Sequence, residues 1–269
     1  LNGSTAYVAA GGDGLLAIDV ATPSAPALVS TIATAGQAGA LALAGSKLYV
    51  ANGFAGFQLF DLASPHSPVF QADLPTALRA VDVVMTTNDL AYVAGGESGL
   101  RIFSLANPLS PALLSRFTGV NNARAVVVSG TKAYVGDGQY GLKIIDVANP
   151  RAPSLLGAYS SAGLGTIRNV GVSGSLVVMS DGRTVLLLDA STPASPSLVG
   201  TYNPTNFALS LAVDSGKVYL ACGNAGLIIL SVAPGGFTQV GSYVSTGSVS
   251  RVAAAGSTAY LAHPTGAWS

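Results

Sequence analysis

One pattern constrains the fold of this chain more than any other: a sequence unit of about 42 residues that recurs along all 269 residues. A segment rich in tyrosine and valine starts at intervals of 41 to 43 residues, and a proline marks a later point of the same unit. The segments start at Tyr7, Tyr49, Tyr92, Tyr134, Val177, Tyr219 and Tyr260, and the prolines are Pro23, Pro65, Pro108, Pro150, Pro193 and Pro234. The chain is therefore built from copies of one structural unit.

Each unit contains four short segments with strand character. In the unit that ends at Tyr159 they are residues 123–128, 132–135, 142–147 and 154–159, which we name the inner, second, third and outer strands. Glycine and proline recur too often for a helix of ten residues. Several segments are apolar at consecutive positions, as in 186–188, which is typical of strands buried on both faces. A period in the low forties with several short strands predicts an all-β fold, a β-propeller of four-stranded blades.

The unit also resembles a known family. Residues 141–159 read GLKIIDVANPRAPSLLGAY, and residues 14–30 and 99–115 are weaker copies of this segment. The segment resembles the LVIVD repeat of bacterial and archaeal surface proteins, and the resemblance covers nearly the whole chain. It implies a β-propeller in an extracytoplasmic setting: secreted, periplasmic or at the cell surface. The family supplies no common activity.

The repeat predicts a single propeller domain over residues 1–269 but leaves its blade number open. The chain begins in the middle of a unit, so we expect a processed or incomplete terminus. If the sequence is complete, the last inner strand, residues 250–255, can fill the slot missing at the N-terminus. Closure removes exposed strand edges and would give six blades, the number we favour. If the chain is a fragment, the ring has seven.

Composition argues against several classes of function. Twelve basic and twelve acidic residues give a formal net charge of zero, without the basic excess typical of proteins that bind nucleic acid. No apolar run reaches the roughly 18 residues of a membrane span. We therefore expect neither a nucleic-acid partner nor membrane insertion. The lone cysteine, Cys222, can form no internal disulfide and no cysteine-rich zinc site.

Two positions of the unit are expected to meet near the propeller axis, because antiparallel pairing places the start of each inner strand beside the end of the second strand. Four of the chain's eight arginines occupy the first position. We assign Gly39, Arg79, Arg124, Arg168, Leu209 and Arg251 to the first position, and Ala10, Asn52, Gly95, Asp137, Asp181, Cys222 and His263 to the second.

The arginines allow two interpretations. They can form a ring of guanidinium groups at the axial mouth that binds a small anion, such as a carboxylate, a phosphate or an acidic sugar. Alternatively, Arg124 pairs with Asp137 and Arg168 with Asp181, as clips between strands, and the equal spacing of the two pairs favours this reading. Arg79 and Arg251 have no acid at the matching position, so they are the better candidates for contacting a ligand.

The remaining residues that could carry chemistry do not form a recognisable catalytic set. His263 lies at the same predicted mouth, but a single imidazole cannot supply the ligands that zinc or a transition metal usually takes. Glycine-rich turns such as residues 11–14 lack the helix that a phosphate-binding loop requires. We therefore expect no metal and no cofactor. No nucleophile lies beside a base, which favours a protein that is not an enzyme.

Two further groups have simpler roles. Short polar residues follow the third strands on the opposite face, where they can accept backbone N–H bonds and hold the corner at the prolines. They are Asp19, Asp61, Asp146 and Asp189, followed by Thr22, Ser64, Asn107, Asn149 and Thr192. Four aromatic residues at the tips of turns, Phe54, Phe57, Tyr140 and Phe207, are candidate contacts for a partner or a sugar.

The sequence therefore predicts a non-catalytic binding or scaffolding propeller that recognises a protein or a glycan through one ring face. The alternative is a small-anion-binding protein, or an enzyme, with its site at the axial mouth. The candidate ligand-binding residues at this axial mouth are Arg79, Arg124, Arg168, Arg251, Asp137, Asp181 and His263.

Overall fold

Short β-strands joined by turns make up the part of the chain that the structure describes. The computed structural model describes residues 1–74, 79–256 and 258–263, and within these ranges it contains no helix. The end of the chain, residues 264–269, lies outside them. Two compact units are distinguished: unit 1 comprises residues 1–133 and 146–154, and unit 2 comprises residues 134–145 and 155–269. The single domain predicted over residues 1–269 stays a prediction.

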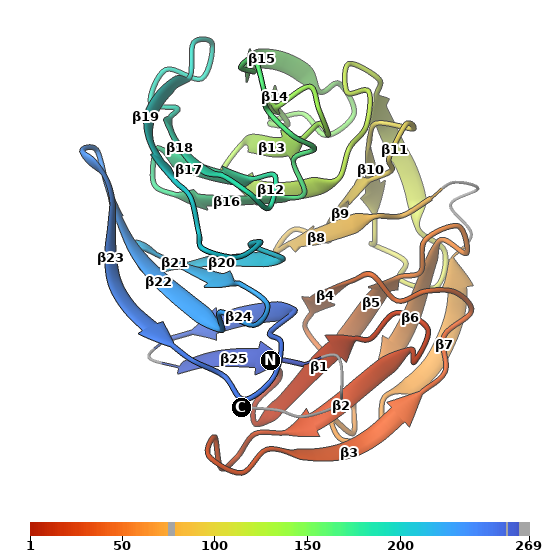
Figure 1. Ribbon diagram of the computed structural model, residues 1–269. Coiled ribbons are helices and arrows are strands. Elements are labelled where there is room, and N and C mark those ends of the chain that lie inside the picture. The colour runs from red at the N-terminus through yellow and green to blue at the C-terminus, as the bar shows by residue number, and fades with distance from the viewer. Residues whose placement is uncertain (75–78, 257, 264–269) are drawn as a thin grey trace. The chain divides into compact units, whose positions relative to one another are not determined.

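The strands form one antiparallel sheet for each sequence unit, in chain order (Figure 1). Blade 1 contains β1 (Thr5–Ala9), β2 (Leu15–Asp19) and β3 (Ala27–Ile32); blade 2 contains β4 (Ala40–Ala44), β5 (Lys47–Ala51), β6 (Phe57–Asp61) and β7 (Val69–Leu74). Blade 3 contains β8 (Asp82–Thr86), β9 (Leu90–Ala94), β10 (Leu100–Ser104) and β11 (Ala112–Phe117). Blade 4 contains β12 (Ala125–Ser129), β13 (Lys132–Gly136), β14 (Leu142–Asp146) and β15 (Ser154–Tyr159).

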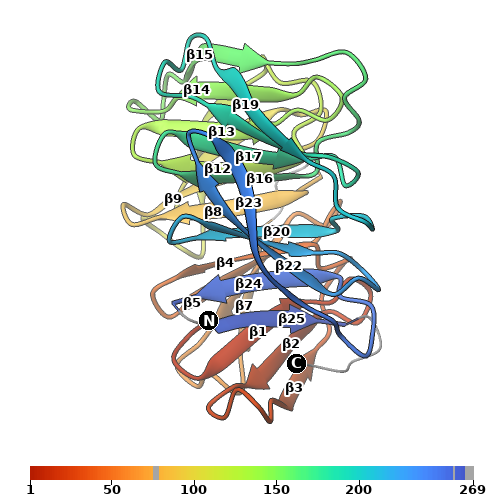
Figure 2. The same ribbon diagram turned by 60° about the vertical axis from the view of Figure 1, so that its left-hand side comes forward.

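The later sheets repeat the arrangement. Blade 5 contains β16 (Asn169–Ser173), β17 (Leu176–Ser180), β18 (Val185–Asp189) and β19 (Ser197–Tyr202). Blade 6 contains β20 (Ser210–Asp214), β21 (Lys217–Ala221), β22 (Leu227–Ala233) and β23 (Gly236–Tyr243), of which the last two lie side by side in Figure 2. The inner strand expected over residues 250–255 is present as β24 (Arg251–Ala255), which pairs with β25 (Thr258–Ala262) in a two-stranded sheet.

The predicted fold is confirmed: the chain is an all-β, six-bladed β-propeller. Blades 2 to 6 have four strands each, and blade 1 shows three. Within unit 1, the inner strand β8 contacts both β4 and β12, and within unit 2, β20 contacts both β16 and β24. Successive blades therefore stack through their inner strands, as propeller blades must to bury their faces.

The core lies between the blades. Tyr49 and Leu59 of blade 2 share one apolar cluster with Val93 and Phe103 of blade 3, and all four side chains are buried. The consecutive apolar run 186–188 is buried throughout, as expected for strands covered on both faces. Burial of such side chains, at roughly 25 cal/mol per Å² of apolar surface, stabilises the stack.

A β-bulge interrupts the outer strand of every blade whose register is described: at the third residue of β3, β7, β11 and β19, and at the fifth residue of the longer β23. One extra residue stands there against a single partner of the third strand. The extra residues are Val29, Gln71, Leu114, Val199 and Val240. The position after the bulge lies close to the corner of the next blade: a Cβ at Gly157 would lie 2.1 Å from the carbonyl oxygen of Pro193.

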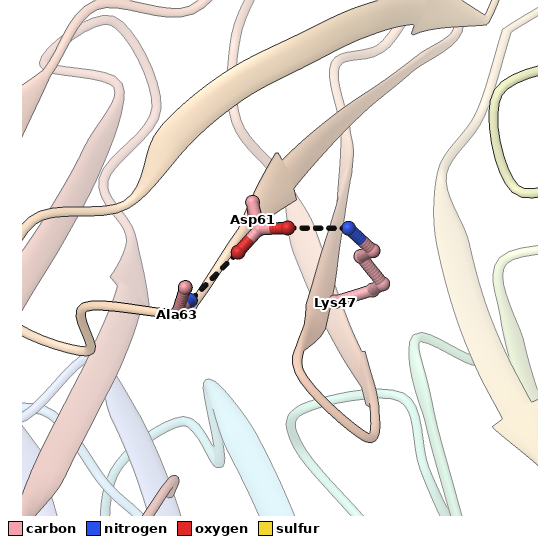
Figure 3. Close-up of polar contacts among 3 residues, drawn as sticks. All are labelled: Lys47, Asp61 and Ala63. Carbon is pink, nitrogen blue, oxygen red and sulfur yellow. Dashed lines mark hydrogen bonds and ion pairs between the residues drawn. The ribbon is translucent and has the colours of Figure 1, made fainter.

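The predicted corner bonds are confirmed. The carboxylates of Asp19, Asp61, Asp146 and Asp189 each accept the backbone N–H two residues later, over 2.7–2.9 Å. Asn107 and Asn149 accept backbone N–H groups in the same way. Figure 3 shows Asp61, which also binds the ammonium group of Lys47. Lys47 first, and the Ala63 N–H second, hold the pKa of Asp61 below its usual value.

Candidate functional site

The strand register corrects the repeat position of two predicted site residues. At five places a buried apolar residue bridges to the glycine after the preceding second strand, and at a sixth place Ala208 donates its N–H to the carbonyl of Gly182. The residue that follows each of these begins the inner strand's pairing. The residues that follow are Gly39, Val81, Arg124, Arg168, Leu209 and Ser250. Only Arg124 and Arg168 share the position assigned to four arginines. Arg79 lies before Ala80, and Arg251 is already the first residue of β24.

Backbone bonds show that the residues of the second predicted position share one place, directly after the second strands. Six of them donate their N–H to the carbonyl at the far side of the following turn: Ala10, Asn52, Gly95, Asp137, Asp181 and Cys222. His263 follows β25 in the same way. In most of these turns the acceptor is four residues later, but Asp181 donates to Thr184, so its turn is one residue shorter.

The four arginines lie in different surroundings. Arg79 is exposed, and its guanidinium lies 5.6 Å from the centre of the Phe54 ring. Arg124 is half-buried and donates from Nε to Asn122 Oδ1 over 3.1 Å. Arg168 and Arg251 are exposed. Arg79 and Arg124 belong to unit 1, and Arg168 and Arg251 belong to unit 2. A common arginine ring at an axial mouth therefore stays a prediction.

Backbone amides, rather than Arg168, satisfy the carboxylate of Asp181. Its Oδ2 accepts the N–H of Gly165 over 2.9 Å. Its Oδ1 accepts the N–H groups of Arg183 and Thr184 over 2.9 and 2.8 Å. The short turn after β17 supplies the Arg183 and Thr184 amides, and the connection between β15 and β16 supplies that of Gly165. Asp181 therefore holds the two loops together, and the expected clip with Arg168 is not the arrangement found.

Asp137 is fully buried, and one of its carboxylate oxygens lies 3.9 Å from the ammonium nitrogen of Lys143. The sequence reading did not identify Lys143. A signal was available, because a polar residue six positions after the end of the second strand recurs in three successive blades: Gln58, Arg101 and Lys143. All three lie at the second position of a third strand.

In blade 2 the same two positions carry a buried amide network that the sequence reading also missed. Asn52 donates from Nδ2 to Gln58 Oε1 over 2.9 Å, and the N–H of Ala35 donates to the same oxygen over 3.0 Å. Gln58 in turn donates from Nε2 to Asp73 Oδ1 over 2.8 Å. Asn52 and Gln58 are buried, so this network fixes the edge of blade 2 rather than facing solvent.

His263 is buried, and its Nε2 lies 3.3 Å from the hydroxyl of Ser245, a contact that the sequence did not predict. Ser245 also accepts the N–H of Gly247 over 3.3 Å, so its hydroxyl takes part in a turn. Within the described ranges, no three His, Cys, Asp or Glu side chains gather as metal ligands. Burial raises the pKa of the Cys222 thiol to about 11, which makes it a poor nucleophile.

The aromatic tips divide into exposed and buried residues. Phe54 is 86% exposed, and Tyr140 and Phe207 are about half exposed, as predicted. The guanidinium of Arg183 lies 5.4 Å from the centre of the Phe207 ring. The prediction for Phe57 is wrong: it is the first residue of β6, is buried, and packs edge to face on Phe103 with 6.2 Å between ring centres.

None of the segments within the described ranges is a helix of the length and apolar character needed to span a bilayer.

Solved structures share the fold at low sequence identity. A protein from Lactobacillus plantarum matches with a TM-score of 0.75 and 14% identity over 96% of this chain and 90% of that one. A putative 6-phosphogluconolactonase from Bacteroides fragilis matches with a TM-score of 0.74 and 15% identity over 96% and 85%. The β-propeller domain of Cps50 (Swd1) from Myceliophteria thermophila matches with 0.67 and 14% over 92% and 85%. These identities indicate a common fold and no more.

Sequence comparison identifies the repeat itself. No curated protein sequence matches the chain. The model of the LVIVD repeat matches residues 1–34, 121–161 and 164–204, which include the segment that carried the predicted resemblance. The match confirms the predicted resemblance over these three stretches, and there the chain carries LVIVD repeats.

Proposed function

We propose that this propeller is a non-catalytic binding protein that recognises a protein or a glycan in an extracytoplasmic setting. Its binding surface is formed by the turns between second and third strands and by the connections that lead into the next inner strand. The observation that carries the proposal is a recurring surface feature, an exposed phenylalanine beside an arginine.

One such pair lies in compact unit 1 and one in compact unit 2. The elements that carry the phenylalanine and the arginine are exchanged between the two pairs. In unit 1, Phe54 lies in the turn between β5 and β6, and Arg79 lies in the connection to β8. In unit 2, Arg183 lies in the turn between β17 and β18, and Phe207 lies in the connection to β20. A ring with an adjacent guanidinium offers an apolar stacking face and a positive charge together, and exposed aromatic and arginine residues are typical of binding hot spots.

A glycan array with the full chain tests the proposal, with Phe54→Ala and Phe207→Ala as variants and Phe70→Ala, on the outer strand of blade 2, as the matched control. We expect binding that is reduced about tenfold or more in at least one of the first two variants and unchanged in the control. If no glycan binds, protein partners are captured by a photo-crosslinker at position 54 or 207. Binding that neither variant weakens would contradict the assignment of the surface.

The second candidate is a small-anion site at the predicted mouth. One observation favours it: Asp181 is satisfied by amides, while Arg168 remains exposed. Titration with phosphate and citrate tests it. The expected result is saturable binding that Arg168→Gln and Arg251→Gln weaken and that Arg151→Gln, at an exposed corner, leaves unchanged.

A further inference from the structure

A cavity of about 180 Å³ lies between blades 2 and 3, entirely within unit 1. Its deep wall consists of three buried aromatic side chains, Tyr49, Phe57 and Phe103, which are between 2% and 7% exposed. Its outer wall includes Leu109, which is 57% exposed, and the exposed Asp73. The cavity is therefore a pocket that opens at the corner of blade 3 and ends on aromatic rings.

The aromatic wall has the chemistry of a site for a cation. Phe57 and Phe103 meet edge to face with 6.2 Å between ring centres, so the two rings border the space from different directions. An organic ammonium group is attracted to the electron-rich faces of such rings, most strongly where water is excluded. The half-buried thioether of Met85 adds a polarizable contact.

The charges around the pocket are negative. Asp73 lines the mouth, and Gln58 Nε2 holds one of its carboxylate oxygens over 2.8 Å, which fixes the position of the carboxylate. None of the described residues that line the pocket is a lysine or an arginine. Burial first, and the charge of Asp89 second, raise the pKa of the Tyr49 hydroxyl, so Tyr49 presents a neutral ring and hydroxyl to the pocket.

We propose that this pocket binds a small organic ammonium ion, a methylated amine whose alkyl groups contact the rings of Tyr49, Phe57 and Phe103 while Asp73 balances its charge. The volume suits a ligand with a single small ammonium head and a short tail. Neither the arginines nor the exposed phenylalanines of the proposed binding surface line this pocket, so the two sites are separate.

The test compares choline with its neutral isostere 3,3-dimethylbutan-1-ol, because the two differ in charge and hardly in shape. The full chain is titrated with each compound at low salt and followed by NMR chemical shifts. Choline is expected to saturate at millimolar concentration, and the alcohol to bind at least about tenfold more weakly. Equal binding of both compounds, or no binding of choline up to about 50 mM, would overturn the proposal.

Variants locate the site. Asp73→Asn keeps the hydrogen bond from Gln58 but removes the charge, and it should weaken choline binding about tenfold. Phe103→Leu removes one ring and should weaken it by a similar factor, with circular dichroism confirming the fold. Asp13→Asn, at an exposed turn of blade 1, is the matched control and should leave binding unchanged. Choline binding that Asp73→Asn does not alter would place the ligand elsewhere and overturn the assignment.

Discussion

Blade 2 and blade 6 have the same four-stranded sheet, but they fill matching positions with opposite chemistry. At the end of the second strand and six positions later, blade 2 has Asn52 and Gln58, joined by a hydrogen bond of 2.9 Å. Blade 6 has Cys222 and Ile228, which are both buried in an apolar cluster. The repeat thus fixes the backbone and leaves the side chains at these two positions free to be polar, as in blade 2, or apolar, as in blade 6.

The contrast extends to two other positions. Asp82, the first residue of β8, accepts the N–H of Val126 on the next inner strand, and Ser210, the first residue of β20, accepts that of Val252. Lys47 faces Asp61 across β5 and β6, whereas Lys217 faces Ser231 across β21 and β22. Blades 2 and 3 therefore use charged groups where blade 6 uses a hydroxyl or an apolar side chain.

The largest effect is expected from Cys222→Asp, which gives blade 6 the buried acid of blade 4 without its lysine. An unpaired buried carboxylate should lower the free energy of unfolding by about 3–5 kcal/mol at neutral pH. Burial raises the pKa of such a carboxyl, so the variant should be closest to wild type in acid and lose stability as the pH rises above the ordinary aspartate value. Urea denaturation at several pH values measures this.

The control is Cys222→Asp/Ile228→Lys, which copies the Asp137–Lys143 pair and should recover part of the loss. If the single and double variants are equally stable at all pH values, the lysine does not compensate the buried acid at these positions.

The next effect is expected in blade 2. Gln58→Leu leaves the buried amide of Asn52 and the N–H of Ala35 without their acceptor, so it should cost about 2 kcal/mol. Ile228→Leu at the matching position of blade 6 changes only shape and should cost less than about 1.5 kcal/mol. Chemical denaturation compares the two variants. Equal losses would mean that the polar pair is not what distinguishes the blades.

A smaller effect is expected from the contacts between inner strands. Asp82→Ala removes a charged acceptor bonded over 2.9 Å, and Ser210→Ala removes a hydroxyl bonded over 3.4 Å. The first should cost about 1–2 kcal/mol and the second about 0.5 kcal/mol. The rate of amide hydrogen exchange at Val126 and at Val252 measures each contact, because these two N–H groups are the donors. Unchanged exchange at Val126 in Asp82→Ala would contradict the inferred connection between the blades.

The smallest effect is expected at the ion pair shown in Figure 3. Because the pKa of Asp61 is lowered in the fold, its contribution is present above the ordinary aspartate pKa and is lost as the pH falls through the lowered value. Asp61→Ser should therefore lower the Tm slightly at neutral pH and low salt, and hardly at all in strong acid. Ser231→Asp, which gives Lys217 a partner, should raise the Tm under the same neutral conditions. An equal loss for Asp61→Ser at every pH would show that charge is not the cause.

Features that depend on local sequence could be predicted well. The strands, the corners and the acceptors at Asp61 and Asn149 follow from apolar runs, prolines and short polar residues that act on neighbours in the chain. Phe57 could also have been placed correctly. It follows Gly56 as Leu15 follows Gly14, at a position that is buried in every described blade.

The contacts of the candidate site residues were harder to predict, because strand register and turn length decide which groups each side chain meets. Arg79 and Arg124 look equivalent in sequence, yet one precedes and the other follows the buried bridging alanine. Asp181 meets amides because its turn is one residue shorter than that of Asp137. The contact of Asp82 with Val126 joins two blades, and no pattern within a single unit reveals it.

The bulge repeated in the outer strands has a consequence for how this molecule behaves among its own copies. A row of nearly identical sheets would invite a strand of one molecule to join the sheet of another, the route by which repeat proteins polymerise. The extra residue at Val29, Gln71 or Val240 breaks the straight line of backbone donors and acceptors that such an addition needs. The β-bulge recurs with the repeat and therefore protects the outer strands of several blades against pairing with strands of other molecules.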